Sequence, residues 1–243
     1  MVDEYKKSYS LRMARNAEKQ EQLLRFLRSE YYVSADNVAA LFNVVALPPV
    51  YRFLSKMEAD GFLVSAVFGD GRGQKLWGLT PHGVAFSFAE DETITDITPF
   101  QPSKISTANI RHHLDVQRLR IFATRQKMHD WLPASSMTVK GVKTPDAVAK
   151  TPTGKLVAIE VERTVKTPKR YREIAGNYLT NRQAQGWDAV WYIMPDSATK
   201  NRVQRIFENI DSVVINGATR NLSELGENPL GFIKFLTYEM IIK

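Results

Sequence analysis

The stretch of residues 144–171 constrains the fold of this chain more than any other. It reads TPDAVAKTPTGKLVAIEVERTVKTPKRY and contains a strand-like run at residues 156–162, after a turn of proline, threonine and glycine. Residues two apart on a strand share a face of the sheet. Glu160 and Glu162 therefore point to one face, and the opposite face carries three apolar side chains, Val157, Ile159 and Val161.

The loop before this strand decides whether Asp146 joins the two glutamates. A three-residue hairpin loop at residues 152–154, with Gly154 in the left-handed conformation, places Asp146 opposite Glu160. A two-residue or four-residue loop shifts the register and turns Asp146 to the other face. The first alternative predicts three carboxylates on one face of a strand pair.

Carboxylates that face each other repel, so a sheet does not normally pair them. A hard divalent cation with oxygen ligands, Mg²⁺ or Mn²⁺, turns this repulsion into coordination. Two glutamates alone more often line a solvated edge, but Asp146 and the lysines that follow favour a metal site. The predicted metal ligands are Asp146, Glu160 and Glu162.

The same residues carry a family resemblance. Pro145-Asp146, with Glu160-Val161-Glu162 beginning fourteen positions after the aspartate and a lysine nearby, resembles the PD-(D/E)-x-K nuclease core. The whole chain resembles the MOB-C class of plasmid mobilisation relaxases, which are related to restriction endonucleases. The resemblance implies metal-dependent nicking of one DNA strand at an origin of transfer. One departure is Glu162, where many nucleases of this group carry lysine.

The resemblance also implies further catalytic residues. Lys169, in the first turn of a helix expected from Thr167-Pro168 to about residue 186, replaces the lysine missing at position 162 and stabilises developing charge. We prefer it to Lys166 because it precedes Tyr171, as in the family pattern. The related relaxases carry a histidine in the long helix expected at residues 105–131, and it matches His112 rather than His113.

Tyr171 invites a covalent role, because relaxases of the better-known type hold the cut DNA end on a tyrosine. Its position argues against that role. Tyr171 begins an apolar stripe at helical spacing, which predicts a core position. The other members of the stripe are Ile174, Ala175 and Tyr178.

Residues 18–89 predict a winged helix-turn-helix domain. Three helical segments, the second capped by Ser34 and the third following Pro48-Pro49, precede two apolar strands joined by a glycine-rich basic tip. In such a domain the third helix enters the major groove and the wing lies along the backbone. The alternative is a protein-contact module. The predicted DNA contacts are Tyr51, Arg52, Ser55, Lys56, Arg72 and Lys75.

The rest of the chain completes an α/β protein, α+β overall. Residues 1–17 form a basic arm that we expect to be frayed, residues 90–104 a linker, and residues 105–243 the nuclease domain. After the hairpin and its helix we expect a strand at 188–194, a helix at 197–209 and a strand at 212–215. This order matches the restriction-endonuclease α/β core, while the pattern of residues 220–243 is ambiguous.

Composition limits the chemistry. Lys and Arg exceed Asp and Glu by 33 to 26, a net charge of +7 that suits a polyanionic partner. With no cysteine, disulfides, thiol catalysis and thiolate metal sites are excluded. The sequence shows no signal peptide and no membrane span, so we expect a cytoplasmic protein.

The leading hypothesis is therefore a plasmid mobilisation relaxase, a metal-dependent, site-specific DNA nickase. The resemblance implies an accessory or coupling protein as a second partner beside plasmid DNA. One rival is a non-catalytic DNA-binding regulator of plasmid mobilisation or replication with a degenerate nuclease fold, which the missing lysine at position 162 favours. A double-strand restriction enzyme is a weaker rival, because one such site in a monomer cuts one strand.

Overall fold

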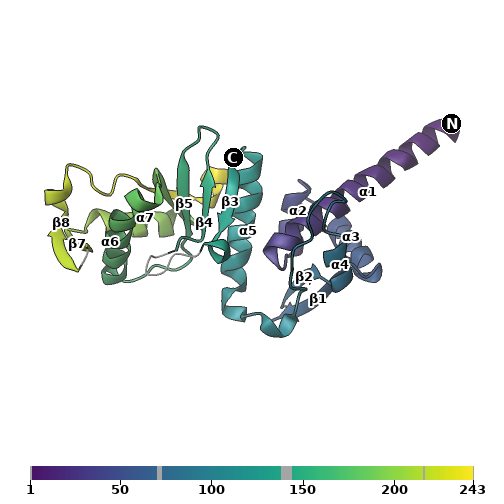
Figure 1. Ribbon diagram of the computed structural model, residues 1–243, viewed down its shortest axis with the longest axis horizontal. Coiled ribbons are helices and arrows are strands. Elements are labelled where there is room, and N and C mark those ends of the chain that lie inside the picture. Colours follow the sequence, from purple (N-terminus) through teal and green to yellow (C-terminus); the bar gives the residue numbers. More distant parts are fainter. Residues whose placement is uncertain (1, 70–72, 138–143, 216, 243) are drawn as a thin grey trace. The chain divides into compact units, whose positions relative to one another are not determined.

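The computed structural model describes four ranges of the chain, residues 2–69, 73–137, 144–215 and 217–242 (Figure 1). Arg72, a predicted DNA contact, lies outside them. The chain forms two compact units, Met1–Arg118 and Leu119–Lys243, and the division falls within a helix.

The N-terminal unit contains three helices followed by an antiparallel hairpin, in the predicted order. The elements are α1 (Val2–Glu30), α2 (Ala35–Leu41), α3 (Leu47–Ala59), β1 (Leu63–Phe68), β2 (Gln74–Leu79), α4 (Pro81–Ala85), single 3-10 turns at Pro102–Lys104 and Thr107–Asn109, and the start of α5 (Ile110–Arg125). Ser34 caps α2 as predicted, accepting a hydrogen bond from the Asn37 amide. The core face of α3 is buried at Val50, Leu54 and Met57.

The first half of α1 corrects the prediction of a frayed arm. Helix α1 begins at Val2, and the side chains of residues 9–18 are exposed. This segment has neither proline nor glycine and is rich in residues of high helix propensity, so it continues the helix without packing. The second half is anchored by buried Leu23, Leu24 and Leu27.

The N-terminal unit extends past the expected linker at residues 90–104. The Phe100 amide donates to the Leu79 carbonyl at 2.9 Å, and Phe100 packs in a buried cluster with Ile110. The Asn37 side chain donates to the Leu114 carbonyl at 2.9 Å. The start of α5 therefore completes the core of the N-terminal unit, whereas the prediction gave it to the nuclease domain.

This boundary can be tested with fragments of the chain. Residues 1–104 lack Ile110, whose burial is worth about 1.5–3 kcal/mol, and we expect this fragment to unfold at lower urea concentration than residues 1–125. The measurement is urea unfolding followed by circular dichroism. Equal stability of the two fragments would restore the boundary near residue 100.

The C-terminal unit is built on a mixed five-stranded sheet. Its strands, in spatial order, are β3 (His129–Pro133), β4 (Ala147–Lys150), β5 (Leu156–Val161), β6 (Ala189–Met194) and β9 (Ile233–Thr237). The β3, β4 and β5 neighbours are antiparallel, whereas β5, β6 and β9 run parallel. The remaining elements are α6 (Pro168–Gln185), α7 (Ser197–Glu208), the separate hairpin of β7 (Ser212–Ile215) and β8 (Ala218–Asn221), a 3-10 turn at Leu222–Leu225, and α8 (Tyr238–Ile242). The chain is thus a mixed α/β protein, as predicted.

Three details of this unit differ from the prediction. The helix expected at residues 105–131 ends at Arg125, because Lys127 adopts a left-handed φ of +60° and the chain turns into β3. The strand expected at 212–215 forms, but it pairs with β8 outside the main sheet. The fifth strand of that sheet, β9, lies in the segment whose pattern was ambiguous.

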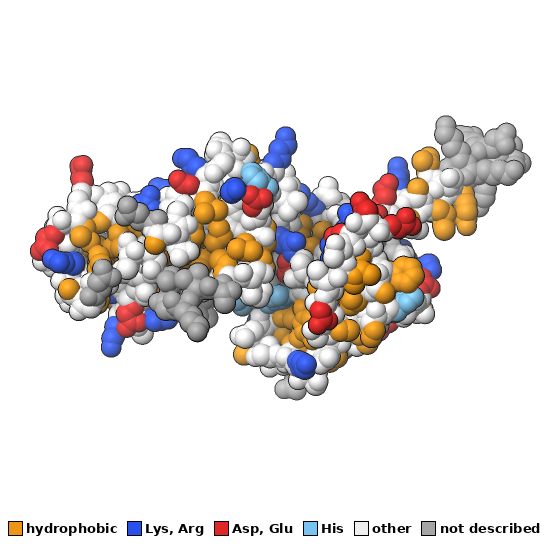
Figure 2. All heavy atoms as spheres, in the orientation of Figure 1, with side chains coloured by type: hydrophobic (Ala, Val, Ile, Leu, Met, Phe, Trp, Pro, Cys, Tyr) orange, Lys and Arg blue, Asp and Glu red, His pale blue; other side chains and the backbone are white. Residues whose placement is uncertain are grey.

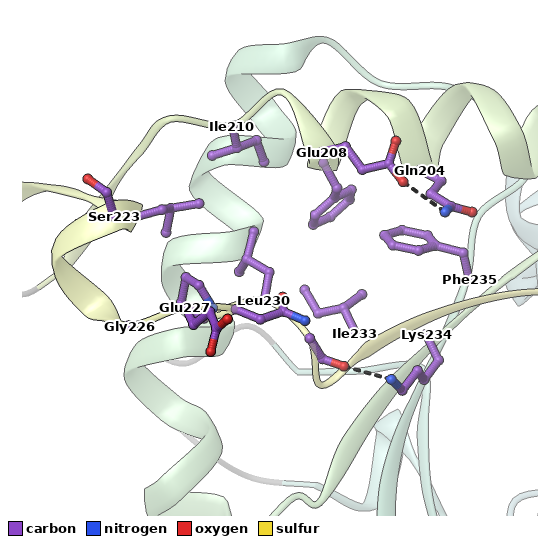
Figure 3. A pocket seen from close by; sticks show the side chains of 15 residues that line it. Gln204, Glu208, Ile210, Ser223, Gly226, Glu227, Leu230, Ile233, Lys234 and Phe235 are labelled. Atoms are coloured by element: carbon purple, nitrogen blue, oxygen red, sulfur yellow. Dashed lines mark hydrogen bonds between the residues drawn. The ribbon is translucent and has the colours of Figure 1, made fainter.

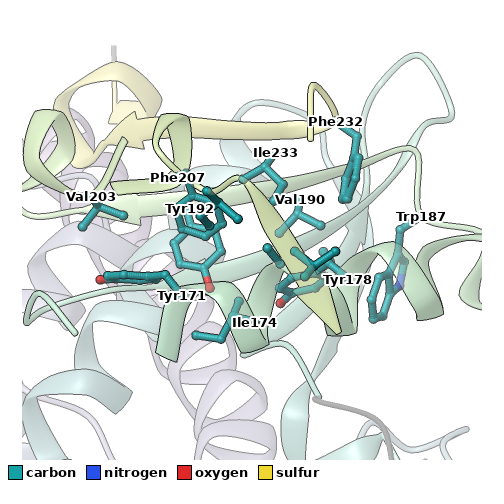
Figure 4. Packing of buried hydrophobic residues seen from close by; sticks show 14 of the residues in the cluster. Tyr171, Ile174, Tyr178, Trp187, Val190, Tyr192, Val203, Phe207, Phe232 and Ile233 are labelled. Carbon is teal, nitrogen blue, oxygen red and sulfur yellow. The ribbon is translucent and has the colours of Figure 1, made fainter. Parts of the chain in front are cut away.

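Helix α6 packs on the sheet through the predicted apolar stripe (Figure 4). Tyr171, Ile174, Ala175 and Tyr178 are all at most 1% exposed, which confirms their core position. The Tyr171 and Tyr192 rings lie 5.3 and 5.5 Å from that of Phe207 in α7.

The β4–β5 hairpin has the register predicted for a three-residue loop. Ala147 pairs with Ile159, and Gly154 has a φ of +81°. Asp146 comes just before the first pair of β4, and its amide donates at 2.9 Å to the carbonyl of Ile159, the residue that pairs with Ala147. Among the described strand pairs none joins Asp146 to Glu160, so the predicted pairing of these two carboxylates is not part of the ladder.

Gly154→Ala should destabilise the protein by about 1–2 kcal/mol, the cost of a left-handed conformation for a residue with a Cβ. No atom lies within 4 Å of the added Cβ, so the effect comes from the backbone alone. Gly154→Asn is the matched control and should cost less, since asparagine tolerates this conformation. Denaturant unfolding measures both, and equal stability of the alanine variant and the wild type would contradict the assignment.

Candidate functional site

Three acidic residues gather along the β4–β5 pair. Asp146 lies just before β4, and its Oδ2 accepts a hydrogen bond from the Val161 amide at 2.7 Å. Glu160 and Glu162, at the carboxyl end of β5, are only 9% and 3% exposed. Ligand sites of α/β sheets occur at the carboxyl ends of parallel strands. Burying a carboxylate costs free energy unless it is paired. Buried ionisable groups cluster at functional sites, so this edge is the candidate site.

Each glutamate is held by a partner on the same side of the sheet. Glu160 accepts a hydrogen bond from the Tyr178 hydroxyl of α6. Glu162 forms an ion pair with the Lys166 ammonium, from the loop before α6.

These partners occupy the residues predicted to bind a metal ion. Within the described ranges, no three acidic or histidine side chains converge closely enough to hold a metal ion. Asp146, Glu160 and Glu162 share the strand pair as predicted, but Tyr178 and Lys166 hold the two glutamates, and the Val161 amide holds an oxygen of Asp146. The metal site therefore stays a prediction.

Three buried tyrosines surround the carboxylates. Burial, with the negative charge of Glu160 close by, raises the pKa of Tyr178 well above its ordinary value. Burial together with Glu160 and Glu162 does the same to the pKa of Tyr192. Tyr178 therefore remains protonated, and a hydrogen-bond donor to Glu160, at any pH near neutrality.

Tyr171 is the third buried tyrosine beside the carboxylates. Its hydroxyl accepts a hydrogen bond from the Lys166 amide at 3.1 Å, and burial, followed by Glu162, raises its pKa to about 12. A buried phenol that stays protonated is a poor nucleophile. This agrees with the interpretation of Tyr171 as a core residue.

The Tyr192 hydroxyl differs from the other two tyrosine hydroxyls of the group. Its residue is 1% exposed, and within the described ranges the hydroxyl has no hydrogen-bond partner. Buried hydroxyls are normally satisfied, and an exception points to a water, ion or ligand at that place. This polar atom lies where the fields of Glu160, Glu162 and Asp146 overlap.

The lysine beside the carboxylates is Lys166, whereas the prediction preferred Lys169. Lys169 lies in the first turn of α6 with an exposed side chain. The predicted cap of this helix is present, since the Thr167 hydroxyl accepts from the Arg170 amide at 3.3 Å. The cap turns the chain into the helix only after Lys166, which leaves Lys166 beside the end of β5.

The two histidines of α5 belong to the N-terminal unit. His113 has a structural role there: its Nε2 lies 2.9 Å from the Glu30 carbonyl, and its ring packs 4.5 Å from that of Tyr32. His112 is half-buried. Its catalytic role stays a prediction.

The predicted DNA-binding residues of the N-terminal unit lie on α3 and β2. Tyr51 is 45% exposed, with its ring 6.0 Å from that of Trp77, and the Lys75 ammonium lies 4.9 Å from the same Trp77 ring. Arg52 and Lys56 are exposed on α3. Acidic neighbours moderate the charge, because Lys56 pairs with Asp60 at 2.6 Å and Lys75 with Glu58 at 3.6 Å.

A hollow of about 520 Å³ lies in the C-terminal unit between the end of α7 and the start of β9 (Figure 3). Its polar groups bond to one another, as Gln204 does to Glu208 and Lys234 to the Gly231 carbonyl. Of the described residues that line it, none belongs to the carboxylate edge.

Comparison with known families identifies the chain. The replication-relaxation family matches residues 24–190, more than half of the sequence. The chain belongs to this family. The match includes α2, α3, β1 and β2 as well as the whole carboxylate edge, and it supports a role in plasmid replication or mobilisation.

More distant comparisons add no argument to the family assignment. Among solved structures, a double mutant of ZitR from Lactococcus lactis in its apo form matches 35% of this chain at 19% identity, with a TM-score of 0.27. The matched part spans 64% of that protein. Comparison with curated proteins found no match. Within the described ranges, no helix of this family member combines the length and apolar character needed to span a bilayer.

The bond between Tyr178 and Glu160 can be measured by a double-mutant cycle. Tyr178→Phe should lower the free energy of unfolding by about 1–3 kcal/mol, because it removes a hydrogen bond to a buried charged group. In a Glu160→Gln background the same change should cost less, since a neutral amide accepts a weaker hydrogen bond. Urea unfolding of the four proteins gives the coupling energy. Identical costs in both backgrounds would show that the two side chains do not interact.

Proposed function

We propose that this protein is a relaxase of plasmid mobilisation that nicks one DNA strand at an origin of transfer with the help of Mg²⁺ or Mn²⁺. The observation that carries the proposal is that Asp146 lies at the end of β5, where its Oδ2 accepts a hydrogen bond from the Val161 amide, between the buried Glu160 and Glu162. Carboxylates gathered at one strand end repel each other unless something binds between them. Family membership supports the DNA substrate.

The donor atoms suit the proposed metal. Asp146 and Glu160 would hold the ion, with Glu162 as a third ligand or as a general base, and carboxylate oxygens are the ligands that Mg²⁺ prefers. The unpartnered Tyr192 hydroxyl is consistent with a further polar partner at this place. When bound, the ion would lower the pKa of a water molecule or polarise the attacked phosphate.

Lys166 is the proposed cation of the site in place of Lys169. It contacts Glu162, so it is already at the carboxylate edge and compensates for the missing lysine at position 162. In the reaction its ammonium would bind the attacked phosphate and stabilise the charge that develops there. The same ion pair explains how Glu162 tolerates burial before the substrate arrives.

The two units fit two parts of this task. We propose that the N-terminal unit is a winged helix whose α3 binds the recognition sequence as duplex, with Tyr51, Arg52, Lys56 and Lys75 at the DNA. The β1–β2 hairpin after three helices supports this assignment. The C-terminal unit would be a restriction-endonuclease-like core, supported by its mixed sheet and by the carboxylates at β4 and β5. An accessory or coupling protein remains part of the proposal.

Nicking of supercoiled plasmid that carries its mobilisation region tests the activity. With Mg²⁺ the wild type should convert it to open circles, and with EDTA it should not. Asp146→Asn and Glu160→Gln should each lower the rate about 100-fold or more, the scale of removing one group that stabilises transition-state charge. Glu173→Gln, an exposed acid of α6 paired with Arg170, is the matched control and should nick normally.

A second function is favoured by the absence of a three-ligand cluster in the described ranges. It is a DNA-binding regulator of plasmid replication or mobilisation whose nuclease-like unit is a scaffold. Tight binding of the plasmid site without metal-dependent nicking, with candidate accessory proteins added, would establish the regulator and refute the nickase.

The choice between the two lysines gives a separate prediction. Lys166→Ala should reduce the nicking rate about 100-fold, because it removes the cation nearest to Glu162. Lys169→Ala should leave the rate within about threefold, as expected for an exposed side chain whose loss perturbs little. The same plasmid assay compares them, and a larger defect in the Lys169 variant would assign the catalytic role to Lys169 instead.

A further inference from the structure

A second hollow, of about 740 Å³, lies between the loop before α6, the first turns of α6, and α7. Four of its lining residues are cations, Lys166, Arg172, Arg202 and Arg205. The other lining residues are Val165, Pro168, Ala198, Asn201, Ile206, Asn209 and Ile210. Among the described residues that line this α6–α7 basic hollow, none is acidic and none is aromatic.

The arginines of the hollow are not used by the fold for ion pairing. The arginine ion pairs of the described ranges are made by other residues, such as Arg170 with Glu173 and Arg28 with Glu92. Like charges held together without counterions repel, so such a cluster is stabilised by an anionic ligand. On the face that Figure 2 shows, several basic side chains of the C-terminal unit stand beside acidic ones.

The start of α6 adds to this positive field. Helix α6 runs for 18 residues from Pro168, which lines the hollow. The N-terminus of a helix carries a partial positive charge that favours phosphate. In α6 this effect comes from the helix dipole, because Pro168 has no amide hydrogen and the Thr167 cap binds the Arg170 amide. Asn201 of α7 adds a side-chain amide to the lining, whereas the Asn209 amide donates to the Arg205 carbonyl.

Lys166 connects the hollow with the candidate site. It lines the hollow and also contacts Glu162 at the carboxylate edge. A ligand that fills the hollow therefore ends beside the carboxylates. The volume matches that of small-molecule sites and admits one or two nucleotides of a single strand, not a duplex. Because none of the described lining residues has an aromatic ring on which bases could stack, the hollow would bind a strand through its phosphates.

We propose that the α6–α7 basic hollow binds the phosphate backbone of the single strand that flanks the nick. The choice of DNA as the ligand rests on the proposed function. The α7 side of the hollow lies beyond residues 24–190, the part of the chain that the family matches. Arg202 and Arg205 belong to this α7 segment.

Fluorescence anisotropy of a labelled twelve-nucleotide thymidine strand tests the proposal, with the full chain in EDTA so that no cleavage occurs. The double variant Arg202→Gln and Arg205→Gln should bind about 10-fold to 100-fold more weakly. Its slope of log affinity against log salt should fall by about 0.7 for each phosphate that the variant no longer binds. Arg202→Lys with Arg205→Lys should keep most of the affinity, and circular dichroism checks that each variant is folded.

The matched control removes the same charge elsewhere in the unit. Lys155→Gln with Arg220→Gln alters two exposed residues outside the hollow and should change affinity less than about threefold, the general effect of net charge. Equal losses in the two double variants would overturn the proposal, as would an unchanged affinity of the hollow variant. If the hollow variant loses binding of thymidine monophosphate but still binds the strand, the hollow is a site for a free nucleotide, and the proposal is overturned as well.

This experiment is independent of the nicking assay. A protein that binds the strand through the hollow but never nicks refutes the nickase alone. A protein that nicks while the hollow variants bind the strand normally refutes the hollow alone.

Discussion

The pairing of β4 with β5 is the constraint on which the candidate site depends. A three-residue loop with Gly154 in the left-handed conformation fixes the register, and that register brings Asp146 to the end of β5, where it accepts a hydrogen bond from the Val161 amide. A slip of one residue would move Asp146 to the other face. Because β5 is also the strand that joins the antiparallel part of the sheet to the parallel part, the same pairing sets where the carboxyl end of β5 meets α6.

Burial of the two glutamates is made possible by their partners. A carboxylate taken out of water needs an opposite charge or hydrogen bonds, and removing one partner of such a pair is strongly destabilising. Tyr178 and Lys166 fill this need for Glu160 and Glu162. A cation could replace the Tyr178 hydroxyl at Glu160, and a phosphate could replace Glu162 at Lys166. The contacts that satisfy the buried carboxylates are thus the same ones on which the proposed ligand chemistry depends.

Local patterns predicted the elements, and long-range contacts decided what they could not predict. The hairpin register, the Ser34 and Thr167 caps and the α6 stripe follow from residues close in sequence. Strand β9 pairs with β6 although α7 and the β7–β8 hairpin lie between them in the chain, and the Phe100 amide bonds to the Leu79 carbonyl of β2. The position of Lys166 depends on where β5 ends relative to the cap of α6, which sequence spacing alone does not fix.

Helix α6 connects stability with the proposed chemistry. Its apolar stripe packs against Tyr192 and Phe207, so the helix position is set by the core. Its first turn then fixes the loop that carries Lys166, and Arg172 one turn further on lines the basic hollow. Tyr178 belongs to the stripe and also donates to Glu160, so a shift of α6 along its axis moves this donor. The same shift moves Lys166, the cation that pairs with Glu162. The two glutamates are therefore coupled through α6, and a ligand that displaces one partner changes the balance of charge at the other.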